Sequence, residues 1–394
     1  MNRDEFLSQI WQAYPTLPQE AGWVFGRWSQ WSTSASQFAP NLHFGALSCA
    51  FDQVSKILNF QDAVALKKNA EGLFQEVLLL SPASDLQKDL RTEMYPKFCL
   101  FLKEVRSFFE GQDFLEMPTP TLVSCPGMEA HLEAFAVETD GGTKHLPTSP
   151  EISLKKRLCE GNDRIFEIKT CFRKDPKSPL HRQEFFMLEW YRAFEPLESL
   201  KKDLQNLLAH LHSKGLWMPA LNWTHESFQS LFKKHLNFDF RPETGTAELK
   251  SLCQSQGIYF HEEDEFEDLI HRIFMERFEP QLKDLVFLED FPPQMAVLSR
   301  LGSSGFAQRF ELYWNQWELA NAFFEVNDPE LQEQRWDQDL AERKRLGKIL
   351  LSKDMELVEA MKTKAMPPSS GIALGLDRLF MAGLGLQDIS EIGF

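Results

Sequence analysis

Apolar residues recur at every third or fourth position between residues 86 and 109, which is the spacing of one helix face. The pattern predicts a long amphipathic helix that starts after Pro82 and Asp85 and ends at Gly111 with a left-handed cap. Such a stripe can pack into the core or form a dimer seam, and the sequence favours the core. The stripe consists of Leu86, Leu90, Met94, Phe98, Phe101, Leu102, Val105, Phe108 and Phe109.

Two later segments alternate between two sets of side chains, as strands do. They flank a polar region that contains Pro176 and Pro179, so we expect an antiparallel hairpin with a long loop. A carboxylate on a buried strand face is costly without a partner, and Glu189 is therefore better explained as a ligand contact than as core. The aligned positions are Phe166, Ile168, Thr170 and Phe172 in the first strand, and Phe185, Met187, Glu189 and Tyr191 in the second.

A second hairpin is expected over residues 310–324, with Asn315-Gln316 as a two-residue turn. This turn pairs Tyr313 with Glu318 and places Glu311 on the same face. The two carboxylates either hold Mg²⁺ for a polyphosphate or are ordinary exposed strand acids.

The same strand carries further candidates beyond Glu318. Simple alternation puts them on the opposite face, so all can line one pocket only if a β-bulge falls near Leu319 or Ala320. These candidates are Asn321, Phe323 and Glu325.

The remaining patterns divide the chain into two domains. Residues 1–84 contain short apolar runs broken by Gly and Ser, which predict a small β-rich module with a helix near 54–71. Residues 85–394 form the larger domain, whose segment 196–280 is expected to be mainly helical. Near the end, Gly371-Ile-Ala-Leu-Gly-Leu-Asp-Arg378 predicts a strand-to-helix junction where two glycines permit close backbone approach.

Composition narrows the classes of function. The 394 residues carry 42 Lys and Arg against 58 Asp and Glu, a net charge of −16, so the chain is a poor general binder of phosphate backbones. The start Met1-Asn-Arg-Asp-Glu5 does not resemble a signal peptide, and no apolar run reaches the roughly 18 residues of a membrane span. We therefore expect a cytoplasmic protein with no membrane partner. The six cysteines lack Cys-x-x-Cys spacing and are expected to be free thiols.

Three segments, in this order, resemble the signature motifs of class II aminoacyl-tRNA synthetases. The resemblance covers about residues 85–394 and implies an α+β fold, an antiparallel sheet flanked by helices, and a homodimer through the motif 1 helix region. The N-terminal module faintly resembles a degenerate OB-fold. The motifs are the long helix with Gly111-Gln-Asp-Phe-Leu-Glu-Met-Pro-Thr-Pro120, then Phe172-Arg-Lys-Asp175 with His181-Arg-Gln-Glu-Phe-Phe-Met-Leu-Glu-Trp-Tyr191, and finally Gly375-Leu-Asp-Arg378.

Within the class, Thr148-Ser-Pro-Glu151, the segment 318–328 and the ending after Asp388 resemble the lysyl branch. This branch includes lysyl-tRNA synthetase and the elongation factor P β-lysine ligase family. Ser149 and Ala373 stand where lysyl-tRNA synthetases usually have Ala and Gly, and both match the ligase family. The resemblance implies that ATP activates lysine or (R)-β-lysine as an aminoacyl-adenylate, which is transferred to a lysine side chain of elongation factor P.

The resemblance also implies roles at the ATP end of the site, with ATP and Mg²⁺ as cofactors. Arg173 would bind the α-phosphate, and Arg378 would hold the far end of the ATP. The nucleotide contacts would be Asp175, His181 and Phe185, with Phe185 stacked on the adenine, and the Mg²⁺ carboxylates would be Glu311 and Glu318.

At the amino-acid end, the same resemblance implies contacts to both ammonium groups of the substrate. Glu151 would receive the ammonium nearest the reacting carboxylate. The distal ammonium would lie among Glu189, Tyr191, Asn321 and Glu325, and the further substrate contacts would be Ser149, Phe323 and Ala373.

Two other functions stay open. The chain could be a divergent lysyl-tRNA synthetase whose N-terminal module touches tRNA, or a non-catalytic paralogue that binds ATP or an amino acid. The acidity favours a protein acceptor over tRNA. Motif 2 also has Pro179 and Leu180 where the family offers an arginine, and Arg182 is the candidate replacement.

Overall fold

The computed structural model describes the backbone of residues 23–27, 38–44, 47–50, 63–68, 74–81 and 90–393, and the side chains of residues 94–393. The chain splits into two compact units, Met1–Asp89 and Leu90–Phe394. None of the helices described is long and apolar enough to cross a membrane.

The first unit contains a 5-stranded sheet with the order β1-β4-β5-β2-β3. The helix expected near residues 54–71 is wrong where β4 lies, because that segment pairs antiparallel with β5. Residues 51–62 and 69–73 lie outside the described part of the chain. The strands are β1 (Trp23–Arg27), β2 (Phe38–Phe44), β3 (Leu47–Ala50), β4 (Ala63–Lys68) and β5 (Phe74–Ser81).

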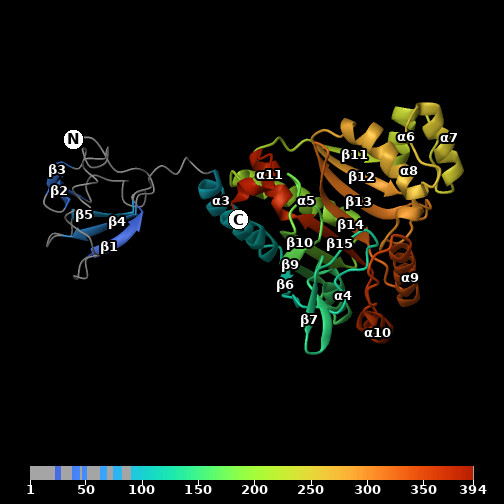
Figure 1. Ribbon diagram of the computed structural model, residues 1–394, viewed down its shortest axis with the longest axis horizontal. Coiled ribbons are helices and arrows are strands. Elements are labelled where there is room, and N and C mark those ends of the chain that lie inside the picture. The colour runs from blue at the N-terminus through green and yellow to red at the C-terminus, as the bar shows by residue number, and fades with distance from the viewer. Residues whose placement is uncertain are drawn as a thin grey trace. The chain divides into compact units, whose positions relative to one another are not determined.

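A large, mostly antiparallel sheet forms the centre of the second unit, as the sequence predicted (Figure 1). Its order is β11-β12-β13-β14-β15-β10-β9-β6, with parallel pairing at its two ends. A separate small hairpin joins β7 (Ala136–Thr139) and β8 (Gly142–His145). The strands of the large sheet are β6 (Leu115–Glu116), β9 (Arg164–Phe172), β10 (Glu184–Ala193), β11 (Trp223–Ser227), β12 (Leu285–Phe291), β13 (Ala307–Trp314), β14 (Trp317–Phe324) and β15 (Ser369–Gly375).

Both predicted hairpins are present in this sheet. β9 and β10 pair antiparallel across the long loop 173–183. The β13–β14 turn has φ of 44° at Asn315 and 77° at Gln316, which is the geometry that a two-residue hairpin turn requires. Tyr313 pairs with Glu318 as expected, whereas Leu312 already pairs with Ala320. Leu319 is therefore an extra residue in β14, and the predicted bulge is confirmed.

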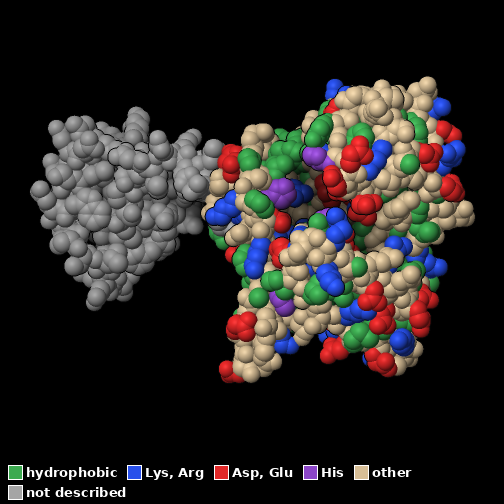
Figure 2. All heavy atoms as spheres, turned by 45° about the vertical axis from the view of Figure 1, so that its right-hand side comes forward, with side chains coloured by type: hydrophobic (Ala, Val, Ile, Leu, Met, Phe, Trp, Pro, Cys, Tyr) green, Lys and Arg blue, Asp and Glu red, His purple; other side chains and the backbone are tan. Residues whose placement is uncertain are grey.

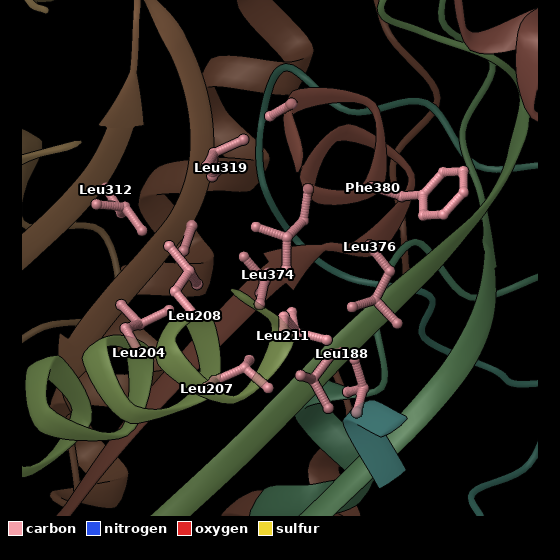
Figure 3. Close-up of a cluster of buried hydrophobic side chains, with 14 of the residues drawn as sticks. Leu188, Leu204, Leu207, Leu208, Leu211, Leu312, Leu319, Leu374, Leu376 and Phe380 are labelled. Atoms are coloured by element: carbon pink, nitrogen blue, oxygen red, sulfur yellow. The ribbon is translucent and has the colours of Figure 1, made fainter. Parts of the chain in front are cut away.

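Helices α3 (Leu90–Glu110), α5 (Leu197–Ser213) and α11 (Leu376–Leu384) pack on one face of the sheet. The leucine and phenylalanine side chains of α5 and α11 pack against Leu188, Leu312 and Leu374 of the strands (Figure 3), and the phenylalanines of α3 belong to the same cluster. Burying such a side chain stabilises a fold by about 1.5–3 kcal/mol. The apolar stripe of α3 is part of this core, so the prediction of a core stripe is confirmed over the described residues from Met94 on.

The cap predicted at Gly111 is wrong in detail. α3 ends at Glu110, but the Gly111 N–H still donates to the Ser107 carbonyl, and the chain continues for two further turn residues. The left-handed residue is Asp113, with a φ of 60°. An aspartate tolerates this conformation better than most residues, so the sequence pattern identified the helix end but not the residue that reverses the chain.

The other helices build two smaller clusters. One cluster packs beside β12 and β13, and comprises α6 (Phe228–Leu236), α7 (Thr246–Gln256), α8 (Phe266–Ile273) and the π-turn Phe274–Phe278. The other joins α4 (Glu151–Cys159), α9 (Pro329–Arg345) and α10 (Met355–Lys364). Short 3₁₀ turns occupy Glu279–Gln281, Pro293–Met295 and Ile389–Ile392. The sheet face opposite α3, α5 and α11 is left for polar side chains.

Candidate active site

This polar face of the sheet carries a cavity of about 470 Å³. Strands β10, β13, β14 and β15 contribute to its wall, and acidic, basic and histidine side chains gather around a hollow in the surface of this unit (Figure 2). Most predicted site residues line it: Ser149, Glu151, Arg173, Asp175, His181, Phe185, Glu189, Glu311, Glu318, Asn321, Phe323, Ala373 and Arg378. Tyr191 and Glu325 lie behind the wall, with 2% and 1% of their surface exposed.

One end of the cavity is rich in arginine. Arg173 follows β9, and its guanidinium lies 5.2 Å from the centre of the Phe185 ring. It donates a long hydrogen bond of 3.4 Å to the Thr148 carbonyl, while its buried Nε finds no partner among the described residues. A guanidinium with an unused, desolvated donor is suited to an anionic ligand.

The loop before β10 is held against the start of α11. Arg378 Nη1 donates to the Glu318 carbonyl at 2.9 Å, and Nη2 lies 2.6 Å from His181 Nε2. Burial and the Arg378 charge lower the pKa of His181, so its ring stays neutral at neutral pH. Arg182 also lines the cavity, where it forms an ion pair with Asp377. The candidate replacement for the missing motif 2 arginine therefore lies at the cavity wall.

The two hairpin carboxylates face the same end. Glu311 accepts hydrogen bonds from Arg309 Nη2 at 2.6 Å and from the Tyr313 hydroxyl at 2.8 Å. Burial and the Glu311 charge raise the pKa of Glu318 to about 7. The charges of Arg378, Arg309 and Arg173 oppose this rise but do not cancel it, so a further cation near the two carboxylates would be favourable, as at a site for a divalent cation with phosphate oxygens.

The other end of the cavity is acidic. Glu151 begins α4, and Glu189 lies on β10 with 2% of its surface exposed. Burial and the Glu151 charge raise the pKa of Glu189 well above its usual value. The Tyr191 hydroxyl donates to Glu189 at 3.3 Å from behind the wall. Buried carboxylates in this number favour a cationic ligand.

Glu325 is linked to this acidic end through Lys155. Lys155 Nζ lies 2.5 Å from Glu151 Oε1 and 2.7 Å from Glu325 Oε2. Burial, with a contribution from the Glu151 charge, raises the pKa of Glu325 to about 7, although the Lys155 charge opposes the shift. The structure thus places Glu325 next to the predicted pocket but not on its surface.

Three residues of the site were missed by sequence reasoning. Arg309 donates to Asn321 Oδ1 at 3.1 Å as well as to Glu311, and the two-residue strand period that selected Glu311 could have found it. Lys155 follows Glu151 by four residues, which places both on one helix face. Glu129 lines the cavity from an irregular loop, and no pattern in the sequence indicates it.

The sequence profile described as tRNA synthetases class II (D, K and N) matches residues 79–394. The chain belongs to this family. Over 328 residues, this class II synthetase is 31% identical to the elongation factor P–(R)-β-lysine ligase of Hamiltonella defensa subsp. Acyrthosiphon pisum (strain 5AT). That alignment covers 79% of the chain and 98% of the relative. The ligase of the same name from Yersinia enterocolitica (serotype O:8 / biotype 1B) is 31% identical over 314 residues, covering 75% of the chain and 92% of the relative.

Family membership confirms the class II synthetase resemblance and the α+β fold. It identifies the chain as a ligase-type enzyme, and this family generally uses ATP. The roles of the individual cavity residues stay predictions.

Proposed function

We propose that the chain activates lysine or (R)-β-lysine with ATP and transfers it to a lysine side chain of elongation factor P. The observation that carries this proposal is that one cavity has an arginine end and a carboxylate end. The first is suited to phosphates and the second to an amino acid with two ammonium groups. The printed name of the relatives supplies the acceptor.

In the first step, a carboxylate oxygen of the amino acid bonds to the α-phosphorus of ATP while the bond to pyrophosphate breaks. Arg173 stabilises the charge on the α-phosphate, and its Nε, which has no hydrogen-bond partner among the described residues, supports this role. Arg378 holds the far end of the ATP, and Phe185 stacks on the adenine. His181 and Asp175 complete the nucleotide contacts.

Glu311 and Glu318 would hold Mg²⁺, which neutralises phosphate charge when bound. The raised pKa of Glu318 supports the assignment, because burial and the Glu311 charge outweigh the opposing charges of Arg378, Arg309 and Arg173, and a bound cation would offset the difference. Arg309 orients Glu311 through its hydrogen bond of 2.6 Å.

The amino acid lies at the acidic end with its reacting carboxylate toward Arg173. Glu151 receives the ammonium nearest that carboxylate, and Glu189 with Asn321 receives the distal ammonium. Tyr191 orients Glu189, and Glu325 adds negative charge from behind the wall. Ser149, Phe323 and Ala373 border the remaining space.

In the second step, the neutral amine of the acceptor lysine attacks the carbonyl carbon of the adenylate. An amide bond forms, AMP leaves with the electron pair of the broken C–O bond, and the amine proton passes to solvent. The enzyme needs no nucleophile of its own for either step, so its contribution is positioning and electrostatic stabilisation.

The proposed assembly is a homodimer through the α3 region. Tyr95 and Leu100 of α3 are 47% and 45% exposed and lie outside the core stripe. Light scattering of the purified chain tests this point, and a monomer at micromolar concentration overturns it.

Pyrophosphate exchange tests the first step. With ATP, Mg²⁺ and either lysine or (R)-β-lysine, we expect amino-acid-dependent return of labelled pyrophosphate into ATP. No exchange with any amino acid would show that the chain is a non-catalytic binder.

Acceptor competition tests the second step. The chain is incubated with ATP, labelled amino acid and either elongation factor P or total tRNA. We expect elongation factor P to become labelled. A five-stranded unit precedes most of the family match at residues 79–394, and this favours tRNA as the second candidate acceptor. Efficient charging of tRNA with no labelling of elongation factor P would establish that alternative instead.

A further inference from the structure

Lys155 is a buried cation at the acidic end of the cavity. It lies on α4, with 1% of its surface exposed, and its ammonium bridges Glu151 and Glu325 at 2.5 and 2.7 Å. Burial lowers the pKa of Lys155, but the charges of Glu151 and Glu325 raise it by more, so the ammonium keeps its proton. Lys155 is not part of the cavity wall and would repel a substrate ammonium, so it is no substrate ligand.

Glu325 is tightly packed on the side of Lys155 opposite Glu151. A Cβ atom on Gly371 would come within 2.3 Å of both Glu325 Oε1 and Tyr191 Cε1, so both side chains sit directly on the Gly371 backbone. The Glu325 N–H donates to the Ser369 carbonyl at 2.9 Å, which fixes the backbone as well. Little space is left for Glu325 to rotate toward the cavity.

The charges at this end do not balance without a ligand. Glu151, Glu189 and Glu325 are three carboxylates, and Lys155 supplies one ammonium, which leaves two negative charges when all are ionised. Glu129 is a fourth carboxylate nearby, but burial and the Glu151 charge raise its pKa against the opposing charge of Arg173, so it keeps a proton more readily than an exposed glutamate and is left out of this count. Two buried uncompensated charges are costly, and an acyl group with two ammonium ions would neutralise them.

We propose that Lys155 is a positioning residue that takes up one carboxylate charge, so that the charge left in the pocket matches a diammonium acyl group. The inference rests on the proposed function, because it names how the same site selects a diamino acid over a mono-amino acid. Lys155 holds Glu151 toward the cavity and Glu325 away from it. Its loss would leave a third uncompensated carboxylate.

The proposal makes a reciprocal prediction about charge-changing variants. Compared with the two negative charges that match a diammonium acyl group, Lys155→Met leaves the pocket with one negative charge more. Glu325→Gln leaves it with one negative charge fewer. Each single variant should raise the KM for lysine or (R)-β-lysine in pyrophosphate exchange by about tenfold or more, since hydrogen bonds to charged groups commonly contribute that much. The double variant Lys155→Met/Glu325→Gln restores the balance and should return to within about threefold of the wild-type KM.

Lys156→Met is the matched control. Lys156 is the next residue on α4, but it pairs with Asp354 and Glu356 at 2.9 and 2.8 Å, away from the cavity. The Lys156→Met variant should leave the KM for the amino acid unchanged. The KM for ATP should stay constant in all four variants, because the changes lie at the amino-acid end, and this separates a lost pocket from a damaged fold.

The double variant decides the question even if Lys155→Met alone fails to fold. A double variant with a near wild-type KM supports the proposal. A double variant at least as impaired as Glu325→Gln alone overturns it, because that is the result expected if Glu325 binds the substrate directly. Wild-type exchange in the same experiment distinguishes a failure of the Lys155 proposal from a failure of the proposed function. Exchange without rescue rejects the role of Lys155 alone, whereas no wild-type exchange and no calorimetric binding of lysine reject the proposed function and this inference together.

Discussion

Glu189 of β10 and Ala373 of β15 lie directly opposite each other across the antiparallel sheet. Ala373 in turn pairs with Asn321 of β14, so its methyl group lies between the two side chains proposed to hold the distal ammonium. Side chains directly opposite each other on neighbouring strands are within contact range. The Ala373 methyl group would therefore touch a substrate that binds between Glu189 and Asn321. The methyl group thus limits the space available to the substrate backbone.

Replacing Ala373 with glycine should shift preference toward α-lysine. The lost methyl group frees space between Glu189 and Asn321, and one methyl group in a pocket changes discrimination by about tenfold or somewhat more. The ratio of kcat/KM for lysine and (R)-β-lysine in pyrophosphate exchange measures this. Ala322→Gly is the control, because Ala322 is buried on the opposite face of the neighbouring strand. An unchanged ratio would remove Ala373 from the specificity argument.

Arg173→Ala should abolish adenylate formation with little loss of stability. Within the part of the chain that the structure describes, the Arg173 side chain makes one long hydrogen bond and a contact with Phe185, so the fold loses little. Removal of a charge-stabilising donor costs about 10²–10³-fold in rate. Arg164→Ala, at the far end of the same strand with a surface partner in Glu195, should keep full exchange activity. Retained exchange in Arg173→Ala would show that the α-phosphate contact is assigned wrongly.

Glu318→Gln should stabilise the ligand-free protein at high pH while it impairs ATP use. The folded-state pKa of about 7 lies above the ordinary glutamate value of 4.5, so the folded protein holds a proton that the unfolded chain releases, and stability falls as pH rises between these values. The neutral variant escapes this loss, which amounts to at most about 3 kcal/mol.

Thermal unfolding without ligand checks this pH dependence. The melting temperature of Glu318→Gln should exceed that of the wild type at about pH 8, and the two should converge toward about pH 5. The exposed Glu262→Gln gives the baseline. Equal melting temperatures at both pH values would mean that Glu318 is ionised in the free enzyme without cost.

Gly371→Ala should destabilise the protein and weaken amino-acid binding together. The new methyl group would meet Glu325 and the Tyr191 ring at 2.3 Å, and such overpacking costs about 1–3 kcal/mol. The comparison is Gly141→Ala in the β7–β8 turn, where the added atom comes no closer than 3.9 Å to the Thr139 hydroxyl. Calorimetric melting and the KM for lysine measure both effects. A stable Gly371→Ala variant would mean that Glu325 and Tyr191 can move apart freely.

Periodicity predicted the parts of this structure that depend on which face a residue takes. Alternation along β13 and β14 was sufficient to pair Tyr313 with Glu318 and to require a bulge, because each strand residue has two possible faces. The resemblance to class II synthetases identified most of the site residues, and these residues line the cavity.

Periodicity does not show how deeply a side chain is buried or which distant residue it pairs with. Glu325 has the right face, but it lies behind the cavity wall and pairs with Lys155, which is 170 residues away in the sequence. Glu129 lies in a loop without a repeating pattern, so its place at the cavity depends on tertiary packing alone. The helix near residues 54–71 was predicted from the local residue pattern, and over residues 63–68 the pairing of β4 with β5 decides the structure instead.

The extra residue Leu319 has a consequence for how this site can vary. Glu318 and Asn321 are three positions apart, yet both face the cavity, because Leu319 shifts the phase of β14 between them. A regular strand with the same three-residue spacing would turn either the carboxylate proposed to bind Mg²⁺ or the amide proposed to bind the amino acid into the leucine-rich core. Substitutions at either end can therefore be explored separately, but the local bulge at Leu319 has to be kept if both side chains are to face the cavity with this spacing.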